Sequence, residues 1–320
     1  MKKVLITGIT GQDGIFLTNT IINNQEDYYI HGISRNKNSK TFFEKLKSLG
    51  LNDFSRIKID EVNLLNEADV NEYLQYVSPS FIYNLAGPSS VYKSFQNPDE
   101  VSLQINGIFD NLINSMIKNN NFPNFFQASS SEMFGDNGKE YQDETGIFLP
   151  NSPYAASKLQ VHKKIQKLRQ KYDFKLVSGI MFNHESELRT KEYLIMKIIN
   201  YAKNLPTVKN SLTLGSLDYV RDWSFAGDIA NCMYSLNENN INEDFVIGSG
   251  QGKKILDILE IIFSEVNKEW EEFVEIDSSL LRIGDPKVLV ANPKKLFTSL
   301  NWKPELNFES LILRCFKLSN

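Results

Sequence analysis

The chain has 320 residues, of which 41% are hydrophobic, 12% aromatic and 23% charged, as in a folded globular protein with a sizeable core. Its 17 glycines and 10 prolines are too few for a collagen-like chain or a linker, and its apolar content excludes a disordered one. With 35 basic and 39 acidic residues the formal net charge is -4, so no overall charge attracts nucleic acid or an anionic membrane. We therefore expect neither as a partner.

Cysteine and hydropathy patterns narrow the class further. The two cysteines, Cys232 and Cys315, are far apart and form no CxxC or Cys/His cluster, which argues against disulfides and structural zinc. We expect no metal site and a cytoplasmic setting. The apolar run at residues 4–7 is too short for a signal peptide, and no stretch approaches the roughly 20 apolar residues of a membrane span.

Short apolar runs alternate with helical periodicity over the first 182 residues. The runs predict strands at residues 4–7, 29–33, 56–59, 81–85, 125–128 and 176–182. The periodicity predicts helices at residues 16–22, 40–49, 66–77, 99–119 and 152–172. Strands that are apolar on both faces and alternate with helices indicate an α/β fold with a doubly wound parallel sheet.

Beyond about residue 185 the alternation loosens, and we expect a smaller, partly helical lobe. Helices are predicted near 191–204 and 255–270, strands at 212–214 and 245–247, and the polar stretch 237–243 is the nearest feature to a linker. We expect residues 1–182 to form a cofactor-binding domain with a return segment near 211–248. Residues 183–210 and 249–320 are expected to form the substrate-binding lobe.

A glycine-rich turn, Gly8-Ile-Thr-Gly11-Gln-Asp-Gly14, follows the first predicted strand and opens a helix. Glycines in such a turn let backbone N–H groups and the helix N-terminus approach a pyrophosphate. The place of the motif between the first strand and the first helix favours a dinucleotide site over a plain strand-to-helix turn.

The end of the second predicted strand bears on the choice of dinucleotide. It reads His31-Gly-Ile33 and continues into Ser34 and Arg35, without the acidic residue that binds a ribose 2′-hydroxyl. An arginine can pair with a 2′-phosphate instead, so NADP is favoured over NAD. A solvated surface arginine is the alternative.

Two YxxxK patterns, Tyr154 with Lys158 and Tyr193 with Lys197, are candidates for an acid–base pair. A predicted helix start precedes Tyr154, and a serine cluster with Glu132 ends the fifth strand. Ligands of open α/β sheets bind at the carboxyl ends of the strands, so these groups are expected to converge on one cleft. Around Tyr193 we expect the apolar residues 194–196 to pack in a helix core.

Tyrosine and lysine one helical turn apart share a helix face, and the ammonium lowers the pKa of the phenol so that it can act as a base near neutral pH. A serine from the strand end can hold a substrate hydroxyl. Glu132 adds a second acid/base, which simple dehydrogenation does not need. An exposed helix pair is the structural alternative for Tyr154 and Lys158.

These motifs together resemble the extended short-chain dehydrogenase/reductase family, and in particular its GDP-mannose 4,6-dehydratases, from the first strand to near the C-terminus. The more specific phrases are Phe182-Asn-His-Glu-Ser186 and Arg221-Asp-Trp223. Others are Tyr83-Asn-Leu-Ala86, Gln127-Ala-Ser-Ser-Ser-Glu-Met-Phe-Gly135, Ser152-Pro-Tyr-Ala155 and Asn301-Trp-Lys-Pro304. The resemblance implies a Rossmann sheet, a smaller C-terminal substrate lobe and a homodimer or homotetramer.

The resemblance also implies a reaction. Ser130 stands at the family's catalytic threonine or serine, Glu132 at its acid/base, Tyr154 at its phenolate base, and Lys158 at the partner of that tyrosine and ligand of the nicotinamide ribose. The implied substrate is GDP-mannose or a close GDP-sugar such as a GDP-heptose. Hydride passes from C4 to C6 through NADP, water is lost, and the product is a 4-keto-6-deoxy sugar.

Binding residues carry over position by position. The expected cofactor-binding residues are Gly8, Thr10, Gly11, Gln12, Asp13, Gly14, Arg35, Asn63, Leu64, Leu85, Ala86, Ser89, Lys158, His184 and Arg189. The expected substrate-binding residues are Ser90, Ser130, Asn183, Lys197, Arg221 and Arg282. Arg221 is expected to pair with a substrate phosphate, whereas a structural salt bridge is the alternative, above all for Arg282.

The chain departs from the family pattern in three places, which bear on the choice of hexose more than on the reaction type. Asn63 replaces the usual acidic residue after the third strand, and the loop 86–91 reads Ala-Gly-Pro-Ser-Ser-Val where the family commonly has a glutamine, a serine and a histidine. The glycine and arginines that usually follow the Asn-His-Glu-Ser phrase are reduced to Glu187-Leu188-Arg189. The alternatives are an epimerase, a decarboxylase or a 4-keto reductase of the same family, or a non-catalytic NADP-binding protein. The presence of Ser130, Glu132, Tyr154 and Lys158 together favours an enzyme.

Overall fold

The computed structural model describes residues 1–35, 40–205, 207–281 and 284–319, and the chain forms two compact units. The first unit comprises residues 1–133, 150–181 and 230–245, and the second comprises 134–149, 182–229 and 246–320. The return segment of the first unit is therefore shorter than the expected 211–248. Residues 211–229 belong to the second unit because strand β10 (Val220–Phe225) pairs there with β8 (Asn183–Glu185), β12 (Gly252–Lys254) and β14 (Val288–Ala291).

The described residues of the first unit are organised around a seven-stranded sheet with the order β11-β7-β5-β4-β1-β2-β3. Its strands are β1 (Lys2–Thr7), β2 (Tyr28–Ile33), β3 (Ile57–Asp60), β4 (Phe81–Asn84), β5 (Asn124–Ser130), β7 (Leu176–Met181) and β11 (Asp244–Ile247). Of β11, the first two residues belong to this unit. The pairs from β3 through β7 are parallel. The strand order reverses between β1 and β4, and such a reversal opens a ligand crevice at the carboxyl ends of the strands.

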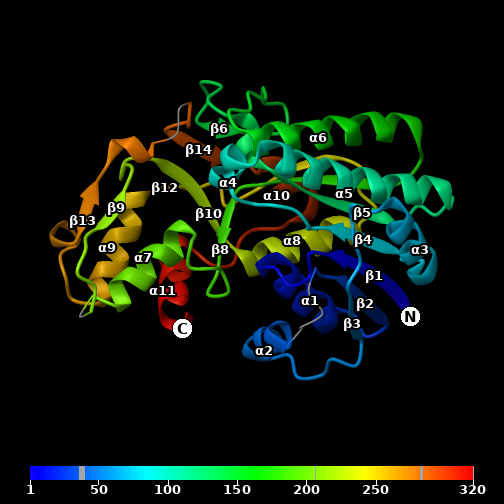
Figure 1. Ribbon diagram of the computed structural model, residues 1–320, viewed down its shortest axis with the longest axis horizontal. Helices are drawn as coiled ribbons and strands as arrows, with labels where there is room; N and C mark the ends of the chain where they lie inside the picture. The colour runs from blue at the N-terminus through cyan, green and yellow to red at the C-terminus, as the bar shows by residue number, and fades with distance from the viewer. Residues whose placement is uncertain (36–39, 206, 282–283, 320) are drawn as a thin grey trace. The chain divides into compact units, whose positions relative to one another are not determined.

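Helices cover both faces of this sheet (Figure 1). They are α1 (Gln12–Asn24), α2 (Lys40–Ser48), α3 (Glu67–Val77), α4 (Val91–Gln96), α5 (Pro98–Lys118), α6 (Pro153–Lys171) and the larger part of α8 (Ala226–Glu238). Side chains of α3, α5 and α6 share one hydrophobic core with Leu5, Ile82 and Phe125 of the strands. On α1, the Thr20 hydroxyl donates to Asn231 of α8 at 3.1 Å. The predicted doubly wound α/β class is confirmed.

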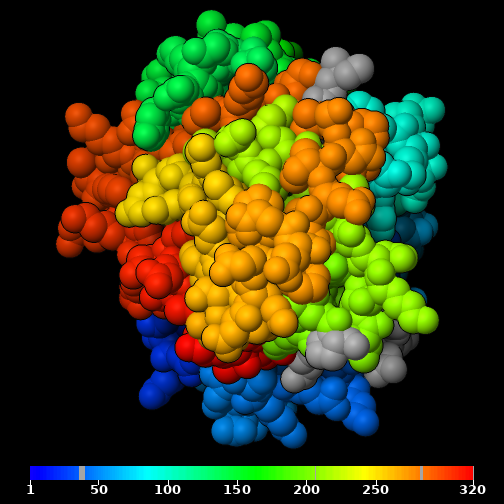
Figure 2. Space-filling model, turned by 90° about the vertical axis from the view of Figure 1, so that its left-hand side faces the viewer, coloured from blue at the N-terminus to red at the C-terminus, as the bar shows by residue number. Residues whose placement is uncertain are grey.

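The second unit combines short strands with a helical core. Its further elements are β6 (Tyr141–Gln142), α7 (Leu194–Lys203), β9 (Leu212–Leu214), α9 (Ile255–Glu265), β13 (Val274–Ile276), α10 (Lys294–Leu300) and α11 (Phe308–Leu318). Residues of α7, α9 and α11 pack around Trp223. The surface formed by α7, α9 and the segment around β13 faces the reader in Figure 2. No helix in the described part of the chain is long and apolar enough to cross a membrane.

The sequence predictions differ from the structure mainly in the second half of the chain. Helix α9 ends at Glu265 instead of near 270, and Asn267 adopts a left-handed conformation with a φ of 54° just beyond it. The stretch 237–243 is not simply a linker, because Asn237 lies in the last turn of α8, is 1% exposed and donates to the Ile82 carbonyl at 3.4 Å. The periodicity did not predict α4, β10, α8, β14, α10 or α11.

Gly14 is the position in the glycine turn with the least space for a side chain. A Cβ there would lie 2.4 Å from the Ile9 carbonyl oxygen and 2.6 Å from the Ile9 Cα, and backbone atoms cannot move aside as a side chain can. We expect Gly14→Ala to lower the free energy of unfolding by about 1–3 kcal/mol, measured by urea denaturation.

Gly107→Ala is the matched control in helix α5. A Cβ there would approach only the flexible end of Leu65, at 3.2 Å, and alanine favours a helix over glycine by about 0.5–1 kcal/mol. The free energy of unfolding should therefore stay unchanged or rise. Equal losses in the two variants would contradict the role of the close approach at Gly14.

Candidate active site

Ser130 and Glu132 are held together at the carboxyl end of β5. Ser130 is the last residue of this strand, and Glu132 follows in the 3₁₀ turn Ser131–Phe134. The Ser130 Oγ accepts a hydrogen bond from the Glu132 N–H at 3.2 Å, which fixes the turn locally. Ser130 is buried, whereas Glu132 is half-buried. The strand end thus presents a hydroxyl and a carboxylate two residues apart.

Tyr154 and Lys158 lie in the first two turns of α6. The helix begins at Pro153, and the Ser152 Oγ caps it by accepting from the Ala155 N–H at 3.1 Å. Both side chains are buried, and the Lys158 Nζ lies 5.6 Å from the centroid of the Tyr154 ring. The predicted pair therefore shares one helix face, as the spacing requires.

The backbone carbonyl of Ala128 connects this helix to β5. The Lys158 Nζ donates to the Ala128 oxygen at 2.9 Å, two residues before Ser130. Burial lowers the pKa of Lys158 from 10.5 to about 8, and the negative charge of Asp13 on α1 opposes this effect. The ammonium still carries its proton at neutral pH, where it can stabilise a nearby phenolate.

The second YxxxK pattern has a different setting in the second unit. Tyr193 immediately precedes α7, and its ring lies against the Arg189 guanidinium, 3.5 Å from the ring centroid to Cζ. Lys197 is exposed and donates to the Thr213 carbonyl at 3.2 Å. The predicted core packing of the neighbouring residues is confirmed for Ile195 and Met196, which are buried.

The glycine turn fits the diphosphate of a dinucleotide. Gly8 has a φ of +70°, and a Cβ there would lie 3.0 Å from the backbone of Ala86. Helix α1 begins at Gln12, and no described side chain caps it at Gly11. Its first N–H groups and the positive end of the helix dipole thus form the kind of site that binds phosphate.

The other predicted cofactor residues of the first unit follow the carboxyl ends of β1 to β4. The hydroxyls of Thr10 and Ser34 lie 3.3 Å apart, and the exposed Arg35 comes next. Gln12 donates to Asp13 at 3.2 Å, and the Ala86 N–H, next to Leu85, donates to the Thr7 hydroxyl at 3.1 Å.

The loops after β3 and β4 are fixed by local hydrogen bonds. The Asn63 Oδ1 accepts from the Leu65 N–H at 3.1 Å, and the Leu64 carbonyl accepts from Asn111 of α5 at 2.9 Å. Ser89 is exposed, and the Ser90 Oγ caps α4 by accepting from the Lys93 N–H at 3.2 Å. These residues therefore lie along one edge of the sheet, where a dinucleotide binds in this class of fold.

The remaining predicted binding residues belong to the second unit. Asn183 pairs with Trp223 between β8 and β10, and the His184 Nδ1 lies 2.7 Å from the Phe182 carbonyl oxygen. Arg189 forms an ion pair with Glu185 at 3.7 Å. Arg282 lies outside the described residues.

Arg221 already has protein partners. Its guanidinium lies 3.1 Å from the Asp285 carboxylate, and it also donates to the Val220 carbonyl at 2.9 Å. Next to it, Asp222 is fully buried and accepts from the Ser249 and Gly250 N–H groups at 2.9 and 2.8 Å. Sequence reasoning did not single out Asp222 or Asp285, although Asp222 stands inside the Arg221-Asp-Trp223 phrase.

Sequence reasoning also did not assign roles to Thr7, Asn84 and Gln127. All three are buried polar residues within apolar strands of the first unit. The sequence does show one polar residue near the carboxyl end of each of three apolar runs. Which of these polar side chains contact one another depends on the register of the sheet.

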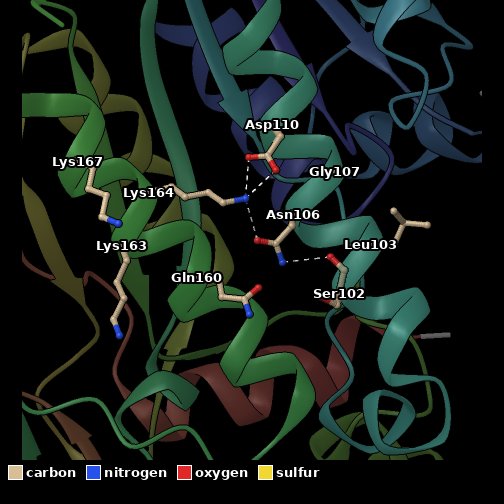
Figure 3. A pocket seen from close by; sticks show the side chains of 9 residues that line it. All are labelled: Ser102, Leu103, Asn106, Gly107, Asp110, Gln160, Lys163, Lys164 and Lys167. Atoms are coloured by element: carbon tan, nitrogen blue, oxygen red, sulfur yellow. Dashed lines mark hydrogen bonds and ion pairs between the residues drawn. The ribbon is translucent and has the colours of Figure 1, made fainter. Parts of the chain in front are cut away.

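An open cavity of about 550 Å³ lies on the first unit between α5 and α6 (Figure 3). Ser102, Leu103, Asn106, Gly107, Asp110, Gln160, Lys163, Lys164 and Lys167 line it. Across it, the Lys164 Nζ donates to both carboxylate oxygens of Asp110, at 2.8 and 2.7 Å. None of the predicted catalytic residues lines this cavity. The candidate active site is therefore assigned to the carboxyl ends of the strands, where those residues lie, and not to this cavity.

Comparison with known proteins identifies relatives over almost the whole chain. Residues 5–315 match the family GDP-mannose 4,6 dehydratase. GDP-mannose 4,6 dehydratase 1 of Arabidopsis thaliana is 32% identical over 97% of this chain and 88% of its own length. GDP-mannose 4,6 dehydratase of Homo sapiens is 31% identical over 96% of this chain and 88% of its own.

Solved structures of similar fold are more distant in sequence. A UDP-glucose 4-epimerase of Thermotoga maritima with UDP-glucose has a TM-score of 0.85 at 19% identity, covering 99% of this chain and 98% of that one. A dTDP-glucose 4,6-dehydratase of Bacillus anthracis in complex with NAD has a TM-score of 0.84 at 18% identity, covering 99% and 96%. At these identities the structures establish the fold alone.

The family match spans nearly all of the chain, and the relatives exceed 30% identity over nearly their whole length. They support the predicted enzyme class, a nucleotide-sugar 4,6-dehydratase. This chain belongs to the GDP-mannose 4,6 dehydratase family.

Proposed function

We propose that this chain is an NADP-dependent dehydratase that converts GDP-mannose, or a close GDP-sugar, into the 4-keto-6-deoxy sugar. The observation that carries the proposal is the arrangement around the end of β5. This strand holds the Lys158 ammonium through the Ala128 carbonyl and then presents Ser130 and Glu132. The lysine beside the Tyr154 phenol is thus bonded to the strand whose end carries a hydroxyl and a separate carboxylate. The relatives named for GDP-mannose support the choice of substrate.

The residues of the first unit fit an NADP molecule. The glycine turn and the start of α1 would hold its diphosphate, and Arg35 would pair with its 2′-phosphate. Bound NADP would supply a hydride acceptor for C4 and afterwards a hydride donor for C6, so the overall reaction would have no net redox change.

Tyr154 and Lys158 would act on the hydroxyl at C4. The phenolate oxygen of Tyr154 removes its proton as C4 is oxidised, and the Lys158 ammonium favours the phenolate because it places a positive charge near the ring. Ser130 would donate a hydrogen bond that orients the same oxygen. Because Lys158 is buried, its charge is less screened than that of a surface lysine.

Glu132 would carry out the elimination. A ketone at C4 makes the C5 proton acidic, so the carboxylate can remove it and then protonate the departing C6 hydroxyl. The C5–H and C6–O bonds break, a double bond forms between C5 and C6, and water leaves. Return of the hydride to C6 and uptake of a solvent proton at C5 would then give the 4-keto-6-deoxy sugar. An epimerase or a simple dehydrogenase would not need this carboxylate, which is why the position of Glu132 favours a dehydratase.

Glu132→Gln is the direct test of this role. We expect wild-type protein with GDP-mannose and NADP to give a 4-keto-6-deoxy product by NMR. In D₂O, we expect deuterium at C5. Glu132→Gln should bind NADP as tightly as the wild type but lower the rate of water loss by about 100-fold or more, the scale of general acid–base catalysis.

The outcomes separate the alternatives. Deuterium exchange at C5 at the wild-type rate in Glu132→Gln would show that another group is the base. A product epimerised at C4 without loss of water would identify an epimerase. Turnover of another nucleotide sugar, with GDP-mannose unchanged, would overturn the substrate assignment.

Arg35 tests the choice of NADP over NAD. Arg35→Ala removes the guanidinium that would pair with the 2′-phosphate, so we expect the Kd for NADP to rise about 10-fold. The Kd for NAD, which lacks this phosphate, is the control and should stay within twofold. Fluorescence titration measures both, and equal changes would contradict the assignment.

Lys158→Met should separate stability from activity. A buried ammonium costs free energy, and a pKa of about 8 instead of 10.5 corresponds to at most about 3 kcal/mol at pH 7. We expect the variant to unfold at higher urea concentration but to lose most of its activity. Between pH 8 and 10.5 the lysine of the wild type has lost its proton in the folded state but still carries it in the unfolded state. The free energy of unfolding of the wild type therefore rises with pH over this range, and the stability difference between Lys158→Met and the wild type becomes smaller.

Lys163→Met, on the same helix but exposed, provides the control for this comparison. Its stability should differ little from that of the wild type. A destabilised Lys158→Met protein would show that the ammonium contributes more through its hydrogen bond than its burial costs.

A further inference from the structure

A row of polar side chains crosses the sheet of the first unit. In the register of the strands, Thr7 of β1 is the partner of Asn84 of β4, and Asn84 is the partner of Gln127 of β5. These residues are 0%, 2% and 3% exposed. Polar groups in such positions are costly unless each of them is hydrogen-bonded.

The side chains of this row bond to one another in a single direction. The Thr7 hydroxyl donates to the Asn84 Oδ1 at 2.7 Å, and the Asn84 Nδ2 donates to the Gln127 Oε1 at 2.8 Å. The Gln127 Nε2 in turn donates to the Ala128 carbonyl at 3.0 Å. At the other end, the Thr7 hydroxyl accepts from the Ala86 N–H at 3.1 Å. The row therefore begins beside the glycine turn and ends on Ala128.

Ala128 is also the partner of Lys158. The pairing of β4 with β5 ends at Asn84 and Gln127, and just beyond it the Ala128 oxygen accepts from the Gln127 amide and from the Lys158 ammonium. A carbonyl oxygen has two lone pairs, so the Gln127 amide restricts where the ammonium can bind. The N–H end of that amide also points its partial positive charge toward the oxygen that the ammonium shares.

We propose that Gln127 is a positioning residue, which, held by Asn84 and Thr7, fixes the Ala128 carbonyl and through it the Lys158 ammonium beside Tyr154. The inference rests on the proposed role of Lys158 as the partner of Tyr154. A glutamine is suited to the position because it accepts from Asn84 with one end and donates to Ala128 with the other. Among the described residues, the charged and titratable groups near the ammonium include Asp13 of α1 and Tyr154 of α6.

The test is the pKa of Lys158 itself, followed by NMR in full-length protein enriched with [ε-¹³C]lysine. The Lys158 signal is identified by its loss in Lys158→Arg. Gln127→Met removes the amide and its partial positive charge, so we expect the pKa of Lys158 to rise by about half a pH unit. Gln127→Glu keeps the acceptor for Asn84 and adds a negative charge, so we expect a rise of about one pH unit or more.

Gln142→Met is the matched control. Gln142 is another buried glutamine, 1% exposed, which accepts from Asn137 at 2.9 Å and donates to the same residue at 2.8 Å in the second unit. This variant should lose stability but leave the pKa of Lys158 unchanged. In a turnover assay, Gln127→Met should lower kcat with little change in KM, whereas Gln142→Met should leave both near the wild-type values.

The NMR titration and the turnover assay test this inference separately from the assignment of the substrate. The NMR titration needs no turnover, so it remains valid if GDP-mannose is not converted. An unchanged pKa of Lys158 in Gln127→Met and Gln127→Glu, or an equal shift in Gln142→Met, would overturn the proposal. If Gln127→Met does not fold, the isosteric Gln127→Glu decides the question alone, and a pKa at the wild-type value overturns it.

Discussion

The hydrogen bond between the Lys158 ammonium and the Ala128 carbonyl is the interaction on which the candidate site depends. It joins the helix that carries Tyr154 to the strand that ends in Ser130, so it links the element that carries the phenol to the element that carries the hydroxyl. The lysine is buried, and its pKa is lowered by that burial. A buried charge of this kind persists only where its partners are held in place, because an unpaired one would shift its pKa further or destabilise the fold.

The sheet supplies that rigidity. Parallel strands bring their carboxyl ends to one edge, and the reversal of order between β1 and β4 opens this edge for a ligand. The glycine turn is compact, because the Gly14 backbone approaches Ile9 within the turn, and the Gly8 backbone lies close to Ala86, just beyond β4. The same edge therefore carries both the turn suited to a diphosphate and the strand end suited to proton transfer.

The second unit uses buried ionisable groups for structure. Asp222 is fully buried, and burial raises the pKa of its carboxyl, while the N–H groups of Ser249, Gly250 and Ala291 oppose that rise by hydrogen bonding to it. These bonds link β10 to the segments around β12 and β14. The neighbouring Arg221 is paired with Asp285, so a phosphate at this arginine would meet a guanidinium that protein contacts already orient.

Local features of the sequence determined the α/β class, the glycine turn, the Tyr154–Lys158 pair and the placement of Ser130 and Glu132 at the end of one strand. Each depends on a spacing of a few residues, which the period of a strand or a helix converts directly into geometry. Elements with weaker hydrophobic periodicity, such as β10 and α8, were not predicted from the sequence. The return segment of the first unit is shorter than predicted, because its extent follows from which strands pair.

Only the tertiary structure decided which distant residues meet. Thr7, Asn84 and Gln127 come from three separate segments, and only the parallel pairing of their strands brings them side by side, so that they can form hydrogen bonds. Asp222 and Asp285 are likewise ordinary acidic residues in the sequence, and their roles follow from burial and from the partners that folding brings to them. The physical reason is that hydrogen bonds and ion pairs depend on distance in space, whereas sequence patterns report only the order of residues along the chain.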